Sequence, residues 1–300
     1  MLKLWNLTAF PPLLAITTQS PRGGENFYGI ILDVEEKMNI LTRSALKTRN
    51  NLPYFEIPEF AKLRWVIHAF LTRLGGVSHP PYHSLNVSFS NGDQREDVFR
   101  NRERITSVFG IDPNRLILLK QLQQDGILVL KNPVEMNSSP LEYDALITDI
   151  PNLFLGIRTA DCIPILVADQ KRKVIAAIHA GRQGTAMHIT EKVLRKMKEE
   201  FGSSMSDLLL TLGPSIGPAC YEIDGKVFKE EWEPFALKKK EEKWMLDLAK
   251  INRTQMKKEG IEEEQIFRMD LCTHCHHDLF FSYRREGRTG RQLSFIGILK

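Results

Sequence analysis

The most regular pattern along the chain is a pair of short apolar runs, residues 163–168 and 174–178, with the polar segment DQKRK between them. The runs are aliphatic and contain several β-branched residues, whereas the polar segment is typical of a turn. The pattern therefore predicts two antiparallel strands. A turn centred on residues 170 and 171 would place Cys162 opposite His179, with Cβ atoms about 5 Å apart.

Comparable patterns predict strands and helices on both sides of this hairpin. Alternating apolar and polar residues indicate strands, and apolar residues three or four positions apart indicate helices. Gly110 and Gly202 follow two of the helical patterns, as expected where helices end. The predicted strands are 65–70, 116–119, 126–130, 143–148 and 208–212, and the predicted helices are 93–110, 185–201, 226–235 and 246–257.

The open end of the central hairpin is a candidate reactive site. Pro164 cannot donate a backbone hydrogen bond, which predicts that Cys162 lies just before the strand, in an accessible loop. A thiolate and an imidazole at this spacing suit one shared zinc ion, or His179 could act as the base that deprotonates Cys162. The glycine-spaced turn 180–184 then leads into a helix predicted from Thr185, whose free N–H groups could hold an anion.

Composition and charge narrow the class of protein. The chain has 300 residues, 42% of them hydrophobic and 26% charged, with a net charge of +4, which is typical of a globular enzyme. The basic residues are interspersed with acids, as in 237–243, so we expect no nucleic-acid binding. No apolar span reaches eighteen residues, so no membrane helix is predicted.

We expect residues 1–37 to form a poorly defined extension, with Met38 as an alternative start, and residues 38–300 to form a single domain.

The segment Cys272-Thr-His-Cys275-His-His allows several interpretations. A CxxC pair with adjacent histidines can be half of a zinc site, and CxxCH can be a haem attachment motif. Structural zinc would need further ligands, and only Cys162 and Cys220 remain. Packing at the rim of a pocket is the favoured interpretation, with an accessory metal or a disulfide as alternatives. Free thiols fit a cytoplasmic protein.

The densest cationic cluster is at the C-terminal end, where Tyr283, Arg284 and Arg285 precede Arg288 and Arg291. Arginine forks bind phosphate in a bidentate manner, so a phosphate site is predicted at Arg284 and Arg285. The alternative is a solvated run of charges with an internal ion pair to Glu286.

Several long motifs occur in order along the chain, and together they resemble one known family. They are TRLGGVS (72–78), PPYHSLNVS (80–88), YDALITD (143–149), TADCIPIL (159–166), GPSIGPACYEID (213–224) and FFSYRREGRTGRQLSFIGIL (280–299). From about Leu71 to the C-terminus the chain resembles the multicopper polyphenol oxidoreductase (laccase-like) family, regarded as purine nucleoside phosphorylases with adenosine deaminase activity. The fold implied is mixed α/β (α+β), with two packed mixed β-sheets flanked by helices in the order α/β/β/α and built from β–α–β units.

The resemblance implies a metal centre, with zinc or copper held by His, Cys and His. Cys162 matches the cysteine and His179 the second histidine, whereas Gln123 stands where the family has the first histidine. An amide oxygen is a weaker ligand than an imidazole. His79 and His83 are candidate replacements for the missing ligand.

The resemblance also implies substrate-facing groups and an activity. The substrate-facing groups are Arg73, Ser84 and Asn86. The activity is phosphorolysis of adenosine, inosine and methylthioadenosine by a monomer or small homo-oligomer, with adenosine deamination and polyphenol oxidation as further activities. The alternatives are a thiol hydrolase with Cys162 as nucleophile and His179 as base, and a non-catalytic descendant with a degraded metal site.

Overall fold

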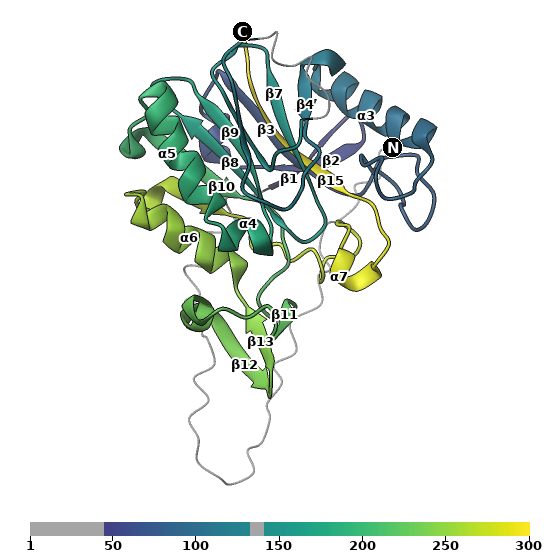
Figure 1. The fold of residues 1–300 in the computed structure, drawn as a ribbon. Coiled ribbons are helices and arrows are strands. Elements are labelled where there is room, and N and C mark those ends of the chain that lie inside the picture. The colour runs from purple at the N-terminus through teal and green to yellow at the C-terminus, as the bar shows by residue number, and fades with distance from the viewer. Residues whose placement is uncertain (1–44, 133–140) are drawn as a thin grey trace, which may run out of the picture.

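Two six-stranded mixed β-sheets pack face to face in this protein (Figure 1). The computed structural model describes residues 45–132 and 141–300. The extension predicted for residues 1–37, and the alternative start at Met38, lie outside the described residues. The first sheet has the strand order β1-β2-β3-β15-β7-β4, and the second has the order β14-β10-β8-β9-β6-β5.

The strands are short and mostly apolar. In the first sheet they are β1 (Ala45–Arg49), β2 (Leu52–Glu56), β3 (Val66–Leu71), β4 (Leu116–Leu118), β7 (Phe154–Thr159) and β15 (Gln292–Ile298). In the second they are β5 (Ile127–Leu130), β6 (Ala145–Thr148), β8 (Ile163–Asp169), β9 (Ile175–Ala180), β10 (Leu208–Leu212) and β14 (Ile266–Arg268). A small third sheet contains β11 (Glu222–Asp224), β13 (Lys243–Leu246) and β12 (Ala236–Lys240).

Helices cover the outer face of each large sheet. The helices of the described residues are α2 (Pro58–Ala61), α3 (Arg95–Phe109), α4 (Arg182–Ala186), α5 (Ile189–Phe201), α6 (Leu248–Lys258) and α7 (Tyr283–Glu286). Buried residues of α3 pack on the first sheet, and those of α5 and α6 pack on the second. The layer order is therefore α/β/β/α, as predicted. Among the described residues, no helix has both the length and the apolar composition needed to span a membrane.

Alternation along the central strands decides which layer each side chain enters. In β8, Ile165 and Val167 contact the helix layer, whereas Leu166 and Ala168 pack toward the first sheet. All seven residues of β8 are buried, as expected for a strand covered on both faces. His179 in β9 has the same parity as the residues that face the first sheet, so its side chain belongs to the layer between the sheets.

The hairpin register differs from the prediction by two residues. Ile163 pairs with Ala180 and Pro164 pairs with His179, because the turn centres between residues 171 and 172. Cys162 is therefore one diagonal step from His179 instead of directly opposite. A shift of two residues leaves every side chain on the same face of the sheet, since strand side chains alternate with a period of two.

Two predicted helices also differ from the structure. The pattern over 185–201 is two helices, α4 and α5, because His188 adopts a left-handed backbone conformation (φ 59°) that interrupts the hydrogen bonding. The pattern over 226–235 yields only a 3-10 helix, Glu230–Phe235, in which Pro234 has no N–H to donate. The helices predicted over 93–110 and 246–257 are confirmed as α3 and α6.

Strand pairing is mainly antiparallel in the described residues. The three parallel pairs, β4 with β7, β5 with β6 and β10 with β14, each include a strand at the edge of a sheet. The prediction that β–α–β units build the fold was therefore wrong for the centre of both sheets. Apolar hairpins and β–α–β units contain similar buried strands, so the sequence pattern does not separate them.

A buried histidine makes stability depend on pH. His68 in β3 is 3% exposed, and its Nε2 accepts a hydrogen bond from the backbone N–H of Ile57 at 2.8 Å. Burial, and then the charge of Lys47, lower the pKa of His68 from 6.5 to about 3. The folded state therefore keeps this ring neutral at pH values where the unfolded chain binds a proton.

We expect the free energy of unfolding to fall as the pH drops from 6.5 toward 3, by up to about 1.4 kcal/mol per pH unit from this group. The stabilisation is fully present above pH 6.5. Urea unfolding at pH 7 and pH 5 should show wild type losing about 2 kcal/mol more than His68→Gln, which cannot titrate. Equal losses in the two proteins would contradict this account.

Candidate functional site

A cavity of about 400 Å³ opens where β7 and β9 end and β8 begins. Loops that follow β4 and β10 and the segment around α7 complete its wall. The lining residues are Ser88, Ser90, Gln121, Gln123, Arg158, Thr159, Ala160, Asp161, Cys162, His179, Arg182, Gln183, Ile216, Tyr221, Leu248, Tyr283, Arg284 and Arg291. Its volume lies within the range of small-molecule sites, roughly 300–1,000 Å³.

Cys162 and His179 meet in this cavity, as the sequence pattern predicts. Cys162 lies one residue before β8, and its thiol interacts with the His179 side chain. The following turn depends on Gly181, because a Cβ there would lie 3.0 Å from the Cys162 Sγ. A larger residue at this position would displace the sulfur from the imidazole.

Asp144 holds the imidazole and the facing loop together. Its carboxylate is fully buried, and the Nδ1 of His179 lies 2.7 Å from its Oδ1. The backbone N–H groups of Leu122, Gln123 and Gln124 donate to the same carboxylate at 3.1, 3.0 and 2.9 Å. Because Asp144 occupies Nδ1, the other ring nitrogen of His179 is the one available to a ligand or a proton acceptor.

The charges in this group stabilise one another. Burial alone would raise the pKa of Asp144, but hydrogen bonds from His179 and from the backbone of Gln124 and Gln123 lower it below its ordinary value. Burial alone would lower the pKa of His179, but Cys162 and then Asp144 raise it to about 9. The hydrogen bond between Asp144 and His179 therefore shifts the two pKa values in opposite directions, each toward the charged form.

Gln123 lies in the wall of the cavity, whereas the two histidines considered as its replacements do not. Gln123 has a left-handed backbone (φ 60°), fixed by its hydrogen bond to Asp144. His79 and His83 are exposed and are absent from the lining. Neither histidine is positioned to complete a site with Cys162 and His179.

Four arginines line the cavity, namely Arg158, Arg182, Arg284 and Arg291, against one carboxylate, that of Asp161. That carboxylate already accepts hydrogen bonds from the Thr273 hydroxyl and the Arg284 backbone N–H, both at 2.7 Å. Burial lowers the pKa of Arg158 and of Arg291, so both guanidinium groups lie in a poorly hydrated environment. The cavity is therefore suited to an anion.

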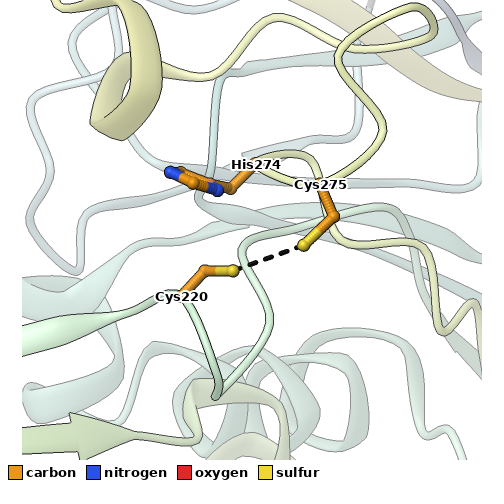
Figure 2. A group of neighbouring side chains, drawn as sticks. All are labelled: Cys220, His274 and Cys275. Atoms are coloured by element: carbon orange, nitrogen blue, oxygen red, sulfur yellow. Dashed lines mark hydrogen bonds between the residues drawn. The ribbon is translucent and has the colours of Figure 1, made fainter. Parts of the chain in front are cut away.

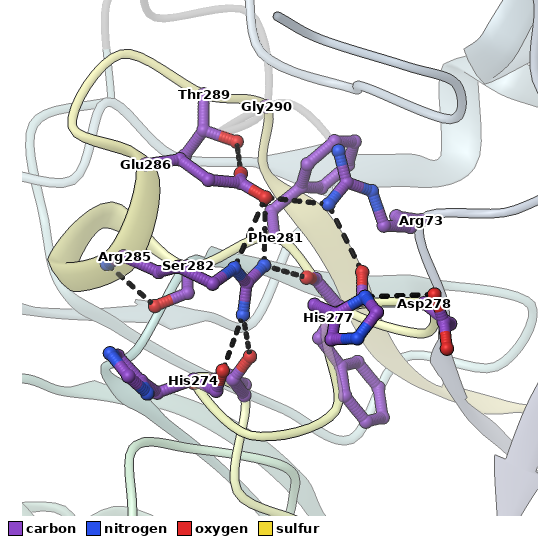
Figure 3. A network of polar contacts seen from close by, with 12 residues as sticks. Arg73, His274, His277, Asp278, Phe281, Ser282, Arg285, Glu286, Thr289 and Gly290 are labelled. Carbon is purple, nitrogen blue, oxygen red and sulfur yellow. Dashed lines mark hydrogen bonds and ion pairs between the residues drawn. The ribbon is translucent and has the colours of Figure 1, made fainter. Parts of the chain in front are cut away.

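Arg73 and Arg285 lie outside this lining and share a different network (Figure 3). The guanidinium of Arg285 donates to the carbonyl oxygens of Thr273, His274 and Phe280 at 2.6–2.8 Å. Both arginines also pair with Glu286, at 2.7 Å from Arg73 and 2.8 Å from Arg285. Their donors hold loops together in the structure, and the substrate role predicted for them stays a prediction.

Ser84 and Asn86, the other predicted substrate groups, are also buried outside the lining. The Ser84 hydroxyl donates to the Arg73 carbonyl at 3.0 Å. The Asn86 Oδ1 accepts from the backbone N–H of Arg291 at 2.9 Å, and its Nδ2 donates to Asp93 at 2.8 Å. Asn86 therefore positions the segment that carries Arg291 into the cavity.

Sequence reasoning assigned no role to several residues that build the site. Asp144 belongs to the YDALITD motif, whose aspartate precedes β6, and Arg158 is the penultimate residue of β7. The sequence signal that could have identified these residues is their position as polar residues at strand ends. The ends of neighbouring strands meet at one edge of a sheet, so such residues can lie close together. Tyr221 was likewise present in the quoted motif GPSIGPACYEID.

A second group with metal-binding chemistry lies beside the cavity. The possible ligand atoms of Cys220, His274 and Cys275 all lie within 4.8 Å of one another. The described residues therefore include a Cys-His-Cys cluster with the composition of a metal site.

Comparisons with known proteins support one family. The model of the multi-copper polyphenol oxidoreductase laccase family matches residues 67–299. A purine nucleoside phosphorylase of Bacteroides thetaiotaomicron is 35% identical over 271 residues, covering 86% of this chain and 99% of that protein. The purine nucleoside phosphorylase YfiH of Escherichia coli is 32% identical over 248 residues, covering 81% of this chain and 98% of that protein.

Solved structures share the fold. The crystal structure of YlmD from Geobacillus stearothermophilus has a TM-score of 0.79 at 28% identity and covers 86% of this chain and 100% of that chain. The hypothetical protein YfiH of Bacillus licheniformis has a TM-score of 0.76 at 34% identity, covering 82% of this chain and 96% of that chain.

Replacing Asp144 by Asn should destabilise the protein. The amide has one acceptor oxygen in place of two and directs its NH₂ at backbone N–H donors, so buried donors lose their partner. We expect a loss of about 1–3 kcal/mol in the free energy of unfolding, measured by urea denaturation. Asp149→Asn is the matched control, since Asp149 is exposed. Equal stability of the two variants would show that Asp144 does not hold the loop.

Proposed function

The chain belongs to the multi-copper polyphenol oxidoreductase laccase family, and on this basis we propose that it cleaves purine nucleosides by phosphorolysis. The proposed substrates are inorganic phosphate with adenosine, inosine or methylthioadenosine. Relatives at 32–35% identity that carry the name purine nucleoside phosphorylase support this reaction.

The observation that carries the proposal is the arginine-rich cavity next to Cys162 and His179. Guanidinium groups bind phosphate oxygens through paired hydrogen bonds, which strengthen where water is excluded. Tyr221 and Tyr283 add aromatic surface to the same wall, suited to a purine ring. One cavity thus offers complementary surfaces to both substrates.

The proposed reaction displaces the base from the sugar. A phosphate oxygen forms a bond to C1′ of the ribose while the bond from C1′ to N9 breaks, and its electron pair stays on the purine. The proton of monohydrogen phosphate ends on the purine, so the products are the free base and the sugar 1-phosphate, which is ribose 1-phosphate for adenosine and inosine and methylthioribose 1-phosphate for methylthioadenosine. The arginines would contribute by holding phosphate in line with the leaving group.

The residues of the cavity suit zinc at two of the three ligand positions that the family resemblance implies. Cys162 and His179 are good zinc ligands, and Asp144 behind His179 is the carboxylate partner that metal-bound histidines usually have. Gln123 offers only an amide oxygen at the third position. When bound, zinc would supply a Lewis acid for adenosine deamination, and copper a redox centre for polyphenol oxidation. We propose that both activities are weak here.

A second candidate is a thiol hydrolase, favoured by one observation. Asp144, His179 and Cys162 form a chain of contacts in which a carboxylate orients an imidazole beside a thiol. This arrangement resembles the acid-base-nucleophile triads of hydrolases. Cys162 would then act as the nucleophile and His179 as its base.

The proposed setting is the cytoplasm. All four cysteines are free thiols, which supports a reducing compartment. The monomeric or small oligomeric state, the single domain over 38–300 and the lack of nucleic-acid binding stay predictions.

We expect Arg291→Ala to raise the KM for phosphate by about 10-fold or more in an inosine phosphorolysis assay, because one charge-assisted hydrogen bond contributes roughly 1.5–3 kcal/mol. The KM for inosine should change less. Arg172→Ala is the control, since Arg172 is exposed in the hairpin turn, far from the cavity lining. Absence of phosphorolysis in wild type would favour a hydrolase or a non-catalytic descendant.

Gln123→His should tighten zinc binding by about 10–100-fold, because an imidazole replaces a weak amide oxygen. Competition with a chromophoric chelator measures the affinity, and Gln124→His on the neighbouring residue is the control.

Alkylation of Cys162 distinguishes the two candidate functions in the same titration. A zinc-bound thiolate is shielded, so labelling should slow as zinc is added to Gln123→His. Unchanged zinc affinity in this variant would argue against Gln123 as the third position. Rapid labelling of zinc-saturated protein would favour the thiol hydrolase.

A further inference from the structure

The tertiary structure brings three cysteines and a histidine together outside the catalytic cavity. Cys220 lies on the loop after β10, and His274 and Cys275 lie on the loop after β14, 54 and 55 positions further along (Figure 2). The sulfurs of Cys220 and Cys275 are 3.3 Å apart, and the ligand atoms of all three residues lie within 4.8 Å of one another.

Cys272 lies next to this group of three, outside the 4.8 Å limit, and is the candidate for a fourth donor. Its sulfur interacts with the thiols of both Cys220 and Cys275. It also accepts a hydrogen bond from the backbone N–H of Gly217 at 3.2 Å, an interaction of the kind that orients and stabilises metal-bound ligands. Cys272 and Cys275 have the C-x₂-C spacing of structural zinc sites, and three cysteines with one histidine are a common tetrahedral set for zinc.

The sulfur separation fits a shared ion better than a bond. Two thiolates on one tetrahedral zinc lie about 3.8 Å apart, given Zn–S distances of about 2.3 Å, whereas disulfide sulfurs lie at about 2.0 Å. Cys275 is exposed, so an ion has an entry path, and the other ligands are partly buried. For the sulfurs of Cys220 and Cys275, the required adjustment is about half an ångström.

Backbone contacts hold the two loops in this arrangement. Ser215 and Cys272 form a parallel β-bridge, and the Thr273 N–H donates to the Ser215 carbonyl at 3.0 Å. The guanidinium of Arg285 fixes the carbonyl oxygens of Thr273 and His274 (Figure 3). The ligands are therefore preorganised, which reduces the entropy lost when an ion binds.

We propose that Cys220, Cys272, His274 and Cys275 bind a structural zinc ion that fastens these two loops together. The site is separate from the pair Cys162 and His179 and does not depend on the proposed phosphorolysis. The loop that carries Cys220 lines the cavity, and the loop that carries His274 and Cys275 supports a lining residue from behind. Tyr221 lines the cavity, and the Thr273 hydroxyl holds the carboxylate of Asp161 at 2.7 Å. Zinc at this position would stiffen the wall of the cavity without contacting a substrate.

The test uses the full chain with the cavity cysteine removed. Cys162→Ala protein, purified under reducing conditions, should retain about one zinc per chain by elemental analysis. The triple variant Cys162→Ala/Cys220→Ser/Cys275→Ser should bind zinc at least about 100-fold more weakly, since two thiolates are lost. Chelation should lower the Tm of Cys162→Ala but leave that of the triple variant unchanged.

Cobalt(II) provides a spectroscopic readout of the same site. Added to metal-free Cys162→Ala protein, it should give the intense visible bands of a tetrahedral site together with thiolate-to-cobalt charge-transfer absorption. His274→Ala should alter the visible bands, whereas His277→Ala should not, since that exposed imidazole pairs with Asp278. A cobalt spectrum without thiolate absorption, or a Cys220–Cys275 disulfide in protein kept under reductant, would overturn the proposal.

Discussion

A buried carboxylate, that of Asp144, is the constraint on which the site depends. It lies at the start of a strand in the second sheet, yet three of its hydrogen bonds come from residues 122–124, in the loop that passes from the first sheet to the second. Its fourth partner is His179. A fully buried charge needs all of these donors, so the two sheets, the loop and the imidazole hold one relative position.

Arginines near the site differ in role according to the hydrogen-bond partners that surround each guanidinium group. Arg284 and Arg285 are adjacent in sequence, and only Arg284 lines the cavity. Arg285 has its donors taken up by carbonyl oxygens and Glu286, together with Arg73. Donors that are satisfied within the protein stabilise loops, whereas guanidinium groups in the cavity wall remain within reach of an anion.

Much of the fold follows from local patterns. The buried runs of β8, β9 and β10 and the capped pattern of α3 were predictable, because strand alternation and helix ends are properties of short segments. The hairpin register and the division between α4 and α5 were not. The register depends on the position of one turn, and the division between the helices depends on the left-handed backbone of His188. At both places the sequence is compatible with alternative local structures of similar energy.

The sequence by itself determined that Cys162 and His179 lie on the same face of the hairpin. Side chains alternate between the two faces along a strand, so a register shift of two residues leaves each side chain on its face. The tertiary structure alone decided the partners of this pair. Asp144 contacts His179 from the start of another strand, Arg158 and Arg291 line the cavity from separate segments, and Cys220 reaches the Cys272–Cys275 loop across the fold. These contacts join residues distant in sequence, and only the packing of the two sheets and their loops brings such residues within bonding distance.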